Sequence, residues 1–238
     1  MKIVGIIPAR YESSRFPGKP LIDLKGKSMI QRVYEGAVKA SMLDRVIVAT
    51  DDKRIYNEVR RFGGEVEMTL GNHTTGTERC GELAAGLDAD IIVNIQGDEP
   101  LVDHRQLDRL CSAFNEEAVQ IATLAIKKVT PADLQNPNRI KIVLDKNSDA
   151  LYFSRSPIPS AIKTIDSLDF YRHIGLYAYR SETLQDLVRL ETTALEKAES
   201  LEQLRWMYHG YKVRIIETDI ETPNIDVPED VQKVIAEL

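Results

Sequence analysis

The sequence predicts an α/β fold with a doubly wound, mostly parallel β-sheet and a small inserted lobe of mixed structure. Short apolar runs alternate with amphipathic segments in the N-terminal half, which is the pattern of βαβ units. Polar loops follow several of these runs, as they do where ligands bind beyond the carboxyl ends of an open sheet. The second half is less regular, but no linker or repeat divides it. We therefore expect one domain over residues 1–238, with the lobe at about 120–220.

The elements of the N-terminal half follow from these runs. Residues 3–7 form a continuous apolar run that Pro8 ends, and the apolar positions of 29–38 fall on one helical face. Residues 46–49 are a second buried run, followed by a polar loop at 50–52 and a charged helix. The remaining expected elements are a strand at 65–68, a helix at 77–87 and a strand at 91–95. Right-handed crossovers between these strands place helices on both faces of the sheet.

The second half predicts shorter strands and a long loop. Residues 154–170 contain two prolines and several Ser and Asp, which is typical of a loop. A strand at 173–180 places His173 and Tyr177 on one polar, aromatic face, as in the wall of a pocket for a hydroxylated ligand. A single strand histidine is, however, more often structural. The other expected elements are strands at 121–127, 140–144, 150–153 and 213–216, and helices at 182–190, 195–208 and from Pro228.

Composition and charge exclude several classes of protein. The chain has 37 acidic and 31 basic residues and a net charge of −6, whereas nucleic-acid binders present a basic face. No apolar run approaches the ~20 residues of a membrane span, and the first residues do not resemble a signal peptide. Two cysteines are too few for a disulfide framework or a Cys-rich zinc site. We expect a cytoplasmic protein with reduced thiols and neither nucleic-acid nor membrane partners.

The loop at residues 8–20 contains a cluster of cations. Arg10, Arg15 and Lys19 follow the first strand, where a doubly wound sheet places its phosphate-binding turn. Arginine presents a planar pair of donors to phosphate oxygens, and lysine presents a point charge. The loop therefore predicts a binding site for the phosphates of a nucleoside triphosphate. A solvated basic loop is the alternative. A Gly-x-Gly-x-x-Gly fingerprint is absent, which disfavours a dinucleotide-dependent oxidoreductase, and a Walker A motif is absent as well.

Two aspartates are candidate ligands for a magnesium ion. Asp98 follows a buried strand and a glycine, and Asp226 lies in a second acidic turn near the C-terminus. Magnesium binds one or two carboxylates and completes its coordination with water and substrate oxygens. The alternative at both positions is an acidic residue that starts a helix.

Longer motifs occur in a fixed order along the chain. They are Ile7-Pro8-Ala9-Arg10-Tyr11, Ser14-Arg15-Phe16-Pro17-Gly18-Lys19-Pro20-Leu21, Val48-Ala49-Thr50-Asp51, His73-Thr74-Thr75-Gly76-Thr77-Glu78-Arg79, Val93-Asn94-Ile95-Gln96-Gly97-Asp98-Glu99-Pro100, Ala150-Leu151-Tyr152-Phe153-Ser154-Arg155, His173-Ile174-Gly175-Leu176-Tyr177, Leu201-Glu202-Gln203-Leu204-Arg205 and Asp226-Val227-Pro228-Glu229-Asp230. Together they resemble the 3-deoxy-manno-octulosonate (Kdo) cytidylyltransferases, also called CMP-Kdo synthetases. The resemblance implies a Rossmann-like nucleotidyltransferase fold.

The resemblance also implies an activity and a set of site residues. CTP and Kdo would give CMP-Kdo and diphosphate, with Mg²⁺ as cofactor, in a homodimer that supplies lipopolysaccharide biosynthesis. The lobe would bind the sugar and contribute to dimerisation. The implied nucleotide-binding residues are Pro8, Ala9, Arg10, Arg15, Lys19, Thr75, Gly76, Thr77 and Asp98, of which Arg15, Lys19 and Asp98 would be catalytic. The implied sugar-binding residues are Gln96, Arg155, His173, Tyr177 and Glu202, with Arg155 as partner of the sugar carboxylate. Asp98 and Asp226 would be the metal ligands.

The C-terminal motif departs from the usual family pattern at two positions. Asn224 and Val227 stand where the family usually has glycine and threonine. Asparagine tolerates a left-handed backbone, whereas valine lacks a hydroxyl that caps a helix, a loss of about 1 kcal/mol. Two alternatives stay open, namely a cytidylyltransferase for an 8-amino analogue of Kdo and a CTP-binding module without catalysis. Sialic acid as substrate is disfavoured by the Kdo-type motifs.

Overall fold

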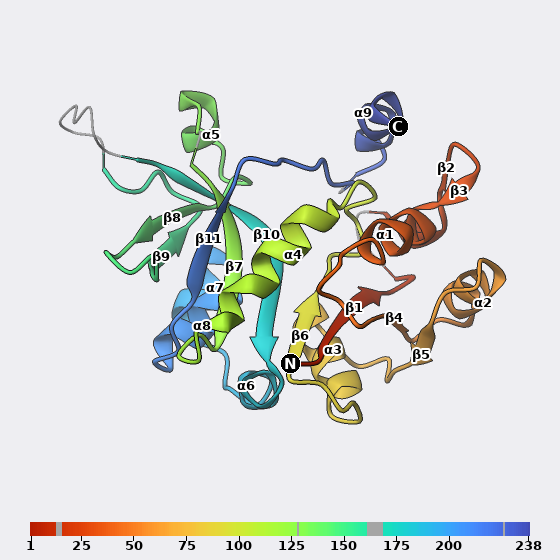
Figure 1. The fold of residues 1–238 in the computed structure, drawn as a ribbon. Helices are drawn as coiled ribbons and strands as arrows, with labels where there is room; N and C mark the ends of the chain where they lie inside the picture. The colour runs from red at the N-terminus through yellow and green to blue at the C-terminus, as the bar shows by residue number, and fades with distance from the viewer. Residues whose placement is uncertain (13–15, 128, 161–168, 226) are drawn as a thin grey trace.

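A mixed sheet forms the centre of the protein in this computed structural model (Figure 1). The structure describes residues 1–12, 16–127, 129–160, 169–225 and 227–238. Within them, nine strands form one sheet in the order β11-β7-β10-β6-β1-β4-β5, with β8 paired to β10 and β9 paired to β8. The strands are β1 (Ile3–Ala9), β4 (Arg45–Thr50), β5 (Val66–Met68), β6 (Ile91–Asn94), β7 (Ile121–Ile126), β8 (Lys141–Leu144), β9 (Ala150–Ser154), β10 (Tyr171–Arg180) and β11 (Arg214–Thr218). A short hairpin contains β2 (Asp23–Leu24) and β3 (Lys27–Ser28).

Helices cover both faces of this sheet, which confirms the doubly wound prediction. The α-helices are α1 (Met29–Ala37), α2 (Lys53–Arg61), α3 (Gly76–Ala84), α4 (His104–Ser112), α5 (Pro131–Gln135), α6 (Ser181–Leu187), α7 (Ala194–Glu199), α8 (Gln203–Tyr208) and α9 (Asp230–Glu237). On one face, α1, α2 and α4 bury Ile30, Ile55 and Leu107 against the strands. On the other face, α3, α6 and α8 bury residues such as Cys80 and Trp206. The periodic apolar stripes of the helices therefore account for two core layers.

Parallel pairing brings three loops to one edge of the sheet. β1 pairs in parallel with both β4 and β6, with Ala9 opposite Thr50 and Ile6 opposite Asn94. The loops after these strands consequently emerge side by side. β10 is antiparallel between β6 and β7, and a β-bulge interrupts its pairing with β7 between Ile174 and Tyr177.

Some predicted elements differ from the observed ones. The expected helix at 195–208 is divided into α7 and α8, because Ser200 adopts a left-handed conformation (φ 51°) that ends α7. Helix α4 was not expected, although Asp103 caps it by accepting from the Arg105 N–H. Within the described ranges, no helix is both long and apolar enough to cross a membrane.

Candidate active site

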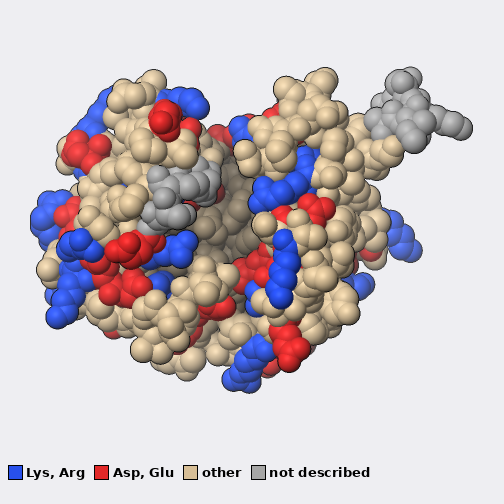
Figure 2. Space-filling view, turned by 180° about the vertical axis from the view of Figure 1, so that it is seen from behind, with Lys and Arg blue, Asp and Glu red and all other residues tan. Residues whose placement is uncertain are grey.

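A cavity of about 210 Å³ lies at the carboxyl ends of β1 and β6. Figure 2 shows a hollow in one face of the molecule, with both basic and acidic side chains around it. The walls of the cavity come from the loop after β1, the turn before α3 and the loop after β6. The lining residues are Pro8, Ala9, Arg10, Lys19, Pro20, His73, Thr74, Thr75, Gly76, Arg79, Gln96, Gly97 and Asp98. Most of the predicted nucleotide-binding residues are thus brought together in one cavity.

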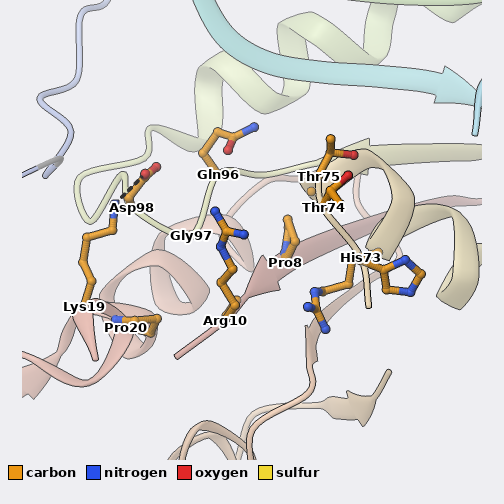
Figure 3. Close-up of a pocket in the computed structure, with 13 residues that line it drawn as sticks. Pro8, Arg10, Lys19, Pro20, His73, Thr74, Thr75, Gln96, Gly97 and Asp98 are labelled. Atoms are coloured by element: carbon orange, nitrogen blue, oxygen red, sulfur yellow. Dashed lines mark hydrogen bonds and ion pairs between the residues drawn. The ribbon is translucent and has the colours of Figure 1, made fainter. Parts of the chain in front are cut away.

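Lys19 is the best-defined cation of this cavity. It begins a 3₁₀ turn (Lys19–Leu21) after Gly18, whose φ of 72° favours glycine and whose N–H donates to the Tyr11 carbonyl. The Lys19 ammonium donates to Asp98 Oδ2 and to the Ile225 carbonyl, each at 2.8 Å. Figure 3 shows Lys19 and Asp98 pointing toward one another. Two oxygens from distant segments therefore converge on one cation.

This pair of oxygens fits the chemistry of a magnesium site. A carboxylate and a backbone carbonyl are hard oxygen donors of the kind that Mg²⁺ prefers. Ile225 immediately precedes Asp226, the second ligand that the sequence predicts. Asp226 itself lies outside the described residues, as does Arg15. Among the residues that are described, no group of three or more His, Cys, Asp and Glu side chains is arranged to hold a metal.

The turn before α3 forms the wall opposite Lys19. Thr75 caps α3 by accepting from the Glu78 N–H, in a capping box. A Cβ on Gly76 would lie 3.1 Å from the Pro8 ring, so glycine lets the turn pack closely on β1. The hydroxyls of Thr75 and Thr77 donate to Glu202 at 3.1 and 2.7 Å. Thr77 is therefore buried beneath the turn, whereas Thr75 and Gly76 line the cavity.

Five lining residues had no role in the sequence-based prediction, and the charged or titratable ones among them are Arg79 and His73. Arg79 is only 3% exposed and donates to Asp51 at 3.0 Å and to Thr69. His73 contacts the Glu82 carboxylate, which keeps the pKa of Glu82 low despite partial burial. Both residues belong to the motif at residues 73–79, which was the available signal for them.

A second cavity, of about 290 Å³, shares Gln96 and Asp98 with the first. Its lining residues are Gln96, Asp98, Glu99, Asn138, Arg139, Ile140, Arg172, His173, Ile174, Gly175, Glu221, Thr222 and Asn224. The Gln96 amide donates to the Gly175 carbonyl at 3.1 Å, beside the β-bulge of β10. Because they share these residues, the two cavities adjoin each other, which suits two substrates that react with each other.

The predicted sugar-binding residues do not all line these cavities. Gln96 and His173 line the second one. Arg155 lines neither, because its guanidinium donates to the backbone carbonyls of residues 137, 199 and 200. Tyr177 is 7% exposed, and its ring packs against His173 and Trp206. Glu202 lies beneath the turn before α3, where burial raises its pKa and the threonine hydroxyls partly offset this.

His173 is held as a neutral imidazole. Its Nε2 lies 2.9 Å from the Thr123 hydroxyl, and its ring contacts Phe153 edge-on. Burial lowers the pKa of His173 from 6.5 to about 3. His173 is thus an uncharged hydrogen-bonding group in the cavity wall at neutral pH.

This burial predicts an acid-dependent loss of stability. The unfolded chain binds a proton at His173 below pH 6.5, whereas the folded protein does not until about pH 3. The stability that the neutral His173 contributes to the folded state is therefore fully present above pH 6.5 and is lost as the pH falls from 6.5 toward 3. At pH 5 the free energy of unfolding is lower by at most about 2 kcal/mol. Denaturant unfolding of wild type and His173→Asn at pH 5 and pH 7.5 measures it. We expect a smaller pH dependence in the variant; equal dependence in both proteins contradicts the assignment.

Comparisons with known proteins identify the family. A model of the cytidylyltransferase family matches residues 4–218. The 3-deoxy-manno-octulosonate cytidylyltransferase of Parabacteroides distasonis is 51% identical over 99% of this chain and 98% of that protein. The enzyme of the same name from Syntrophobacter fumaroxidans is 50% identical over 99% of this chain and 96% of its own length.

Solved structures agree with this assignment. A CMP:2-keto-3-deoxy-manno-octonic acid synthetase complexed with CTP superposes with a TM-score of 0.95, at 43% identity over 100% of this chain and 98% of that one. A 4-diphosphocytidyl-2C-methyl-D-erythritol synthase from Anaerococcus prevotii, with a TM-score of 0.66 and 14% identity, shares the fold over 99% of this chain and 97% of that one. The chain therefore belongs to the cytidylyltransferase family and, within it, to the 3-deoxy-manno-octulosonate cytidylyltransferases.

Proposed function

We propose that the chain activates Kdo by transferring the cytidylyl group of CTP to the sugar, with release of diphosphate. The observation that carries this proposal is that two cavities meet at Gln96 and Asp98, so that substrates bound in them come into contact there. Relatives named for Kdo and a solved relative complexed with CTP support the choice of substrates.

The first cavity suits the nucleotide. Arg10 and Lys19 supply positive charge for the triphosphate, and Arg15 is the third cation that the sequence predicts for this role. The backbone at Pro8 and Ala9 and the turn at 75–77 are assigned to the cytosine. Transfer of a phosphoryl-type group depends mainly on positioning and on charge stabilisation, which these groups provide.

The chemical step is an in-line displacement at the α-phosphorus of CTP. The anomeric oxygen of the sugar forms a bond to phosphorus as the bond to diphosphate breaks, and the hydroxyl proton passes to solvent. Asp98 and Asp226 are assigned as the ligands of magnesium. When bound, magnesium would stabilise the negative charge of the phosphate oxygens and lower the pKa of the attacking hydroxyl.

Polar groups of the second cavity suit the sugar hydroxyls. Gln96 and the neutral His173 are assigned to this substrate, because both line the cavity. Direct sugar contacts of Arg155, Tyr177 and Glu202 stay predictions, since they require these side chains to leave the partners described above. Much of the cavity comes from residues 138–175, which supports the proposed sugar-binding lobe at about 120–220.

Three finer assignments complete the proposal. The enzyme acts as a homodimer, in the cytoplasm, and its product enters lipopolysaccharide biosynthesis. Cys80 and Cys111 are both free and buried, which is compatible with a reducing compartment. The homodimer and the pathway rest on the family resemblance.

Diphosphate release from CTP and Mg²⁺ tests the proposed substrates. Kdo, its 8-amino analogue and sialic acid are offered separately, with EDTA as the control. We expect release with Kdo that EDTA abolishes. A preference for the 8-amino sugar would change the substrate while leaving the mechanism in place. Binding of CTP without release for any sugar would instead favour a non-catalytic module.

A further inference from the structure

Two arginines meet at one carboxylate oxygen in the second cavity. Arg172 extends from β10 and its side chain is only 3% exposed, whereas Arg139 precedes β8 and its side chain is 42% exposed. Arg172 Nη1 lies 2.7 Å and Arg139 Nη1 lies 3.0 Å from the same atom, Glu221 Oε1. One carboxylate oxygen thus serves two guanidinium groups that line a cavity.

The three side chains differ in how firmly they are held. A guanidinium as buried as that of Arg172 needs a counter-charge, because an unpaired buried charge is strongly unfavourable. Glu221 supplies that charge, yet its side chain is 48% exposed. It also lies in the irregular segment between β11 and α9, so that it can move aside without breaking a strand or helix. Arg139 has a second acidic neighbour, Asp133, at 3.8 Å.

We propose that Arg139 and Arg172 form the subsite for the carboxylate of the acidic sugar, and that Glu221 occupies this subsite until the sugar displaces it. The inference rests on the proposed function. A planar carboxylate from the substrate accepts from the two guanidiniums as the Glu221 carboxylate does in the free protein.

The position of the subsite agrees with the chemistry of the sugar. In a 2-keto acid, the carboxylate is bonded to the carbon that becomes the anomeric centre, so it must bind close to the reacting oxygen. Arg139 and Arg172 line the same cavity as Asp98, which is shared with the nucleotide cavity. Their positive charge also offsets the repulsion between an anionic sugar and a triphosphate. Arg155, in contrast, donates to three backbone carbonyls.

A neutral analogue of the substrate tests this subsite. The ratio of kcat/KM for Kdo to kcat/KM for its C1 carboxamide is measured in wild type, Arg139→Ala and Arg172→Lys. Because the arginines recognise charge, we expect the ratio to fall at least ~10-fold in Arg139→Ala, mainly through KM for Kdo, with KM for CTP unchanged. Arg172→Lys keeps a charge in the buried position and should lower the ratio less. General damage to the fold would lower kcat/KM for Kdo and for the carboxamide equally. An unchanged ratio would therefore overturn the proposal.

Glu221→Gln provides a test of opposite sign. Loss of the resident carboxylate removes a competitor, so KM for Kdo should fall about 3-fold or more, whereas an increase would contradict the displacement. Glu217→Gln is the matched control, because Glu217 is an exposed carboxylate on β11 that lines neither cavity. Arg189→Ala is the matched control for the substitutions of Arg139 and Arg172, since Arg189 is exposed and lines neither cavity.

Wild-type turnover separates this inference from the proposed function. Absence of diphosphate release by wild type with Kdo would contradict the proposed function itself. Release by wild type with an unchanged Kdo-to-carboxamide ratio in both arginine variants would reject the subsite alone.

Discussion

Replacing Lys19 with alanine is expected to lower kcat by at least ~10²-fold while the protein stays folded. The Lys19 side chain is 13% exposed, and its ammonium is held at the cavity by Asp98 and the Ile225 carbonyl. Its charge is thus fixed where the phosphates of CTP are proposed to lie. Fixed charges that stabilise a transition state need no reorganisation during the reaction, so losing one affects turnover more than binding.

Steady-state kinetics with varied CTP and Kdo measure this effect, and circular dichroism verifies the fold. Lys39→Ala is the matched control, because Lys39 is exposed and lies outside both cavities. The variant Lys19→Arg separates charge from geometry: the charge remains, but a planar fork replaces a point charge. A rate near that of wild type in Lys19→Ala would remove this lysine from the mechanism.

Asp98→Asn is expected to lower turnover by ~10²-fold or more and to raise the Mg²⁺ concentration needed for half-maximal rate. The substitution keeps the shape of the side chain and an oxygen that accepts from Lys19, but it removes the negative charge. A neutral amide is a weaker ligand for a hard divalent cation than a carboxylate. Because Asp98 lines both cavities, we expect the substitution to slow the step in which the two substrates react.

Calorimetric titration with CTP accompanies the rate measurement in this case. Retained CTP binding with lost turnover is the expected pair of results. Asp88→Asn is a suitable control, since Asp88 precedes β6 at the opposite end of the strand and forms only an exposed pair with Lys2 among the described residues. Unchanged turnover and unchanged magnesium dependence in Asp98→Asn would contradict its assignment as a metal ligand.

The strands and helices were predictable where burial is uniform along an element. β1, β4 and β6 are central strands buried on both faces, so continuous apolar runs identified them. The break between α7 and α8 was not predictable, because serine seldom adopts the left-handed conformation that Ser200 has at the end of α7. Helix α4 combines an Asp103 cap with buried Leu107 and Leu110, so its signal was present in the sequence but was not used.

The sites show a similar division. Lys19 and Asp98 were predictable because they follow buried strands, and parallel strands place such residues at one edge. Tyr177 was correctly placed on the face of β10 opposite Ile174, but the pattern does not reveal that Trp206 of α8 covers it. Arg172 was overlooked because it precedes the strand predicted at 173–180, whereas β10 begins at Tyr171 and Arg172 lines the same cavity as His173. Pairing of Arg139 with Glu221 joins segments 82 residues apart, which spacing alone does not reveal.

The most direct test of the proposed reaction is ³¹P nuclear magnetic resonance of the purified protein with CTP, Kdo and Mg²⁺. Attack at the α-phosphorus predicts that the CTP signals decay while a phosphodiester signal and diphosphate appear in equal amounts. Release of inorganic phosphate with formation of CDP would instead locate the attack at the γ-phosphorus. Either that result, or unchanged CTP in a protein that binds it, would contradict the assignment of this chain as a Kdo cytidylyltransferase.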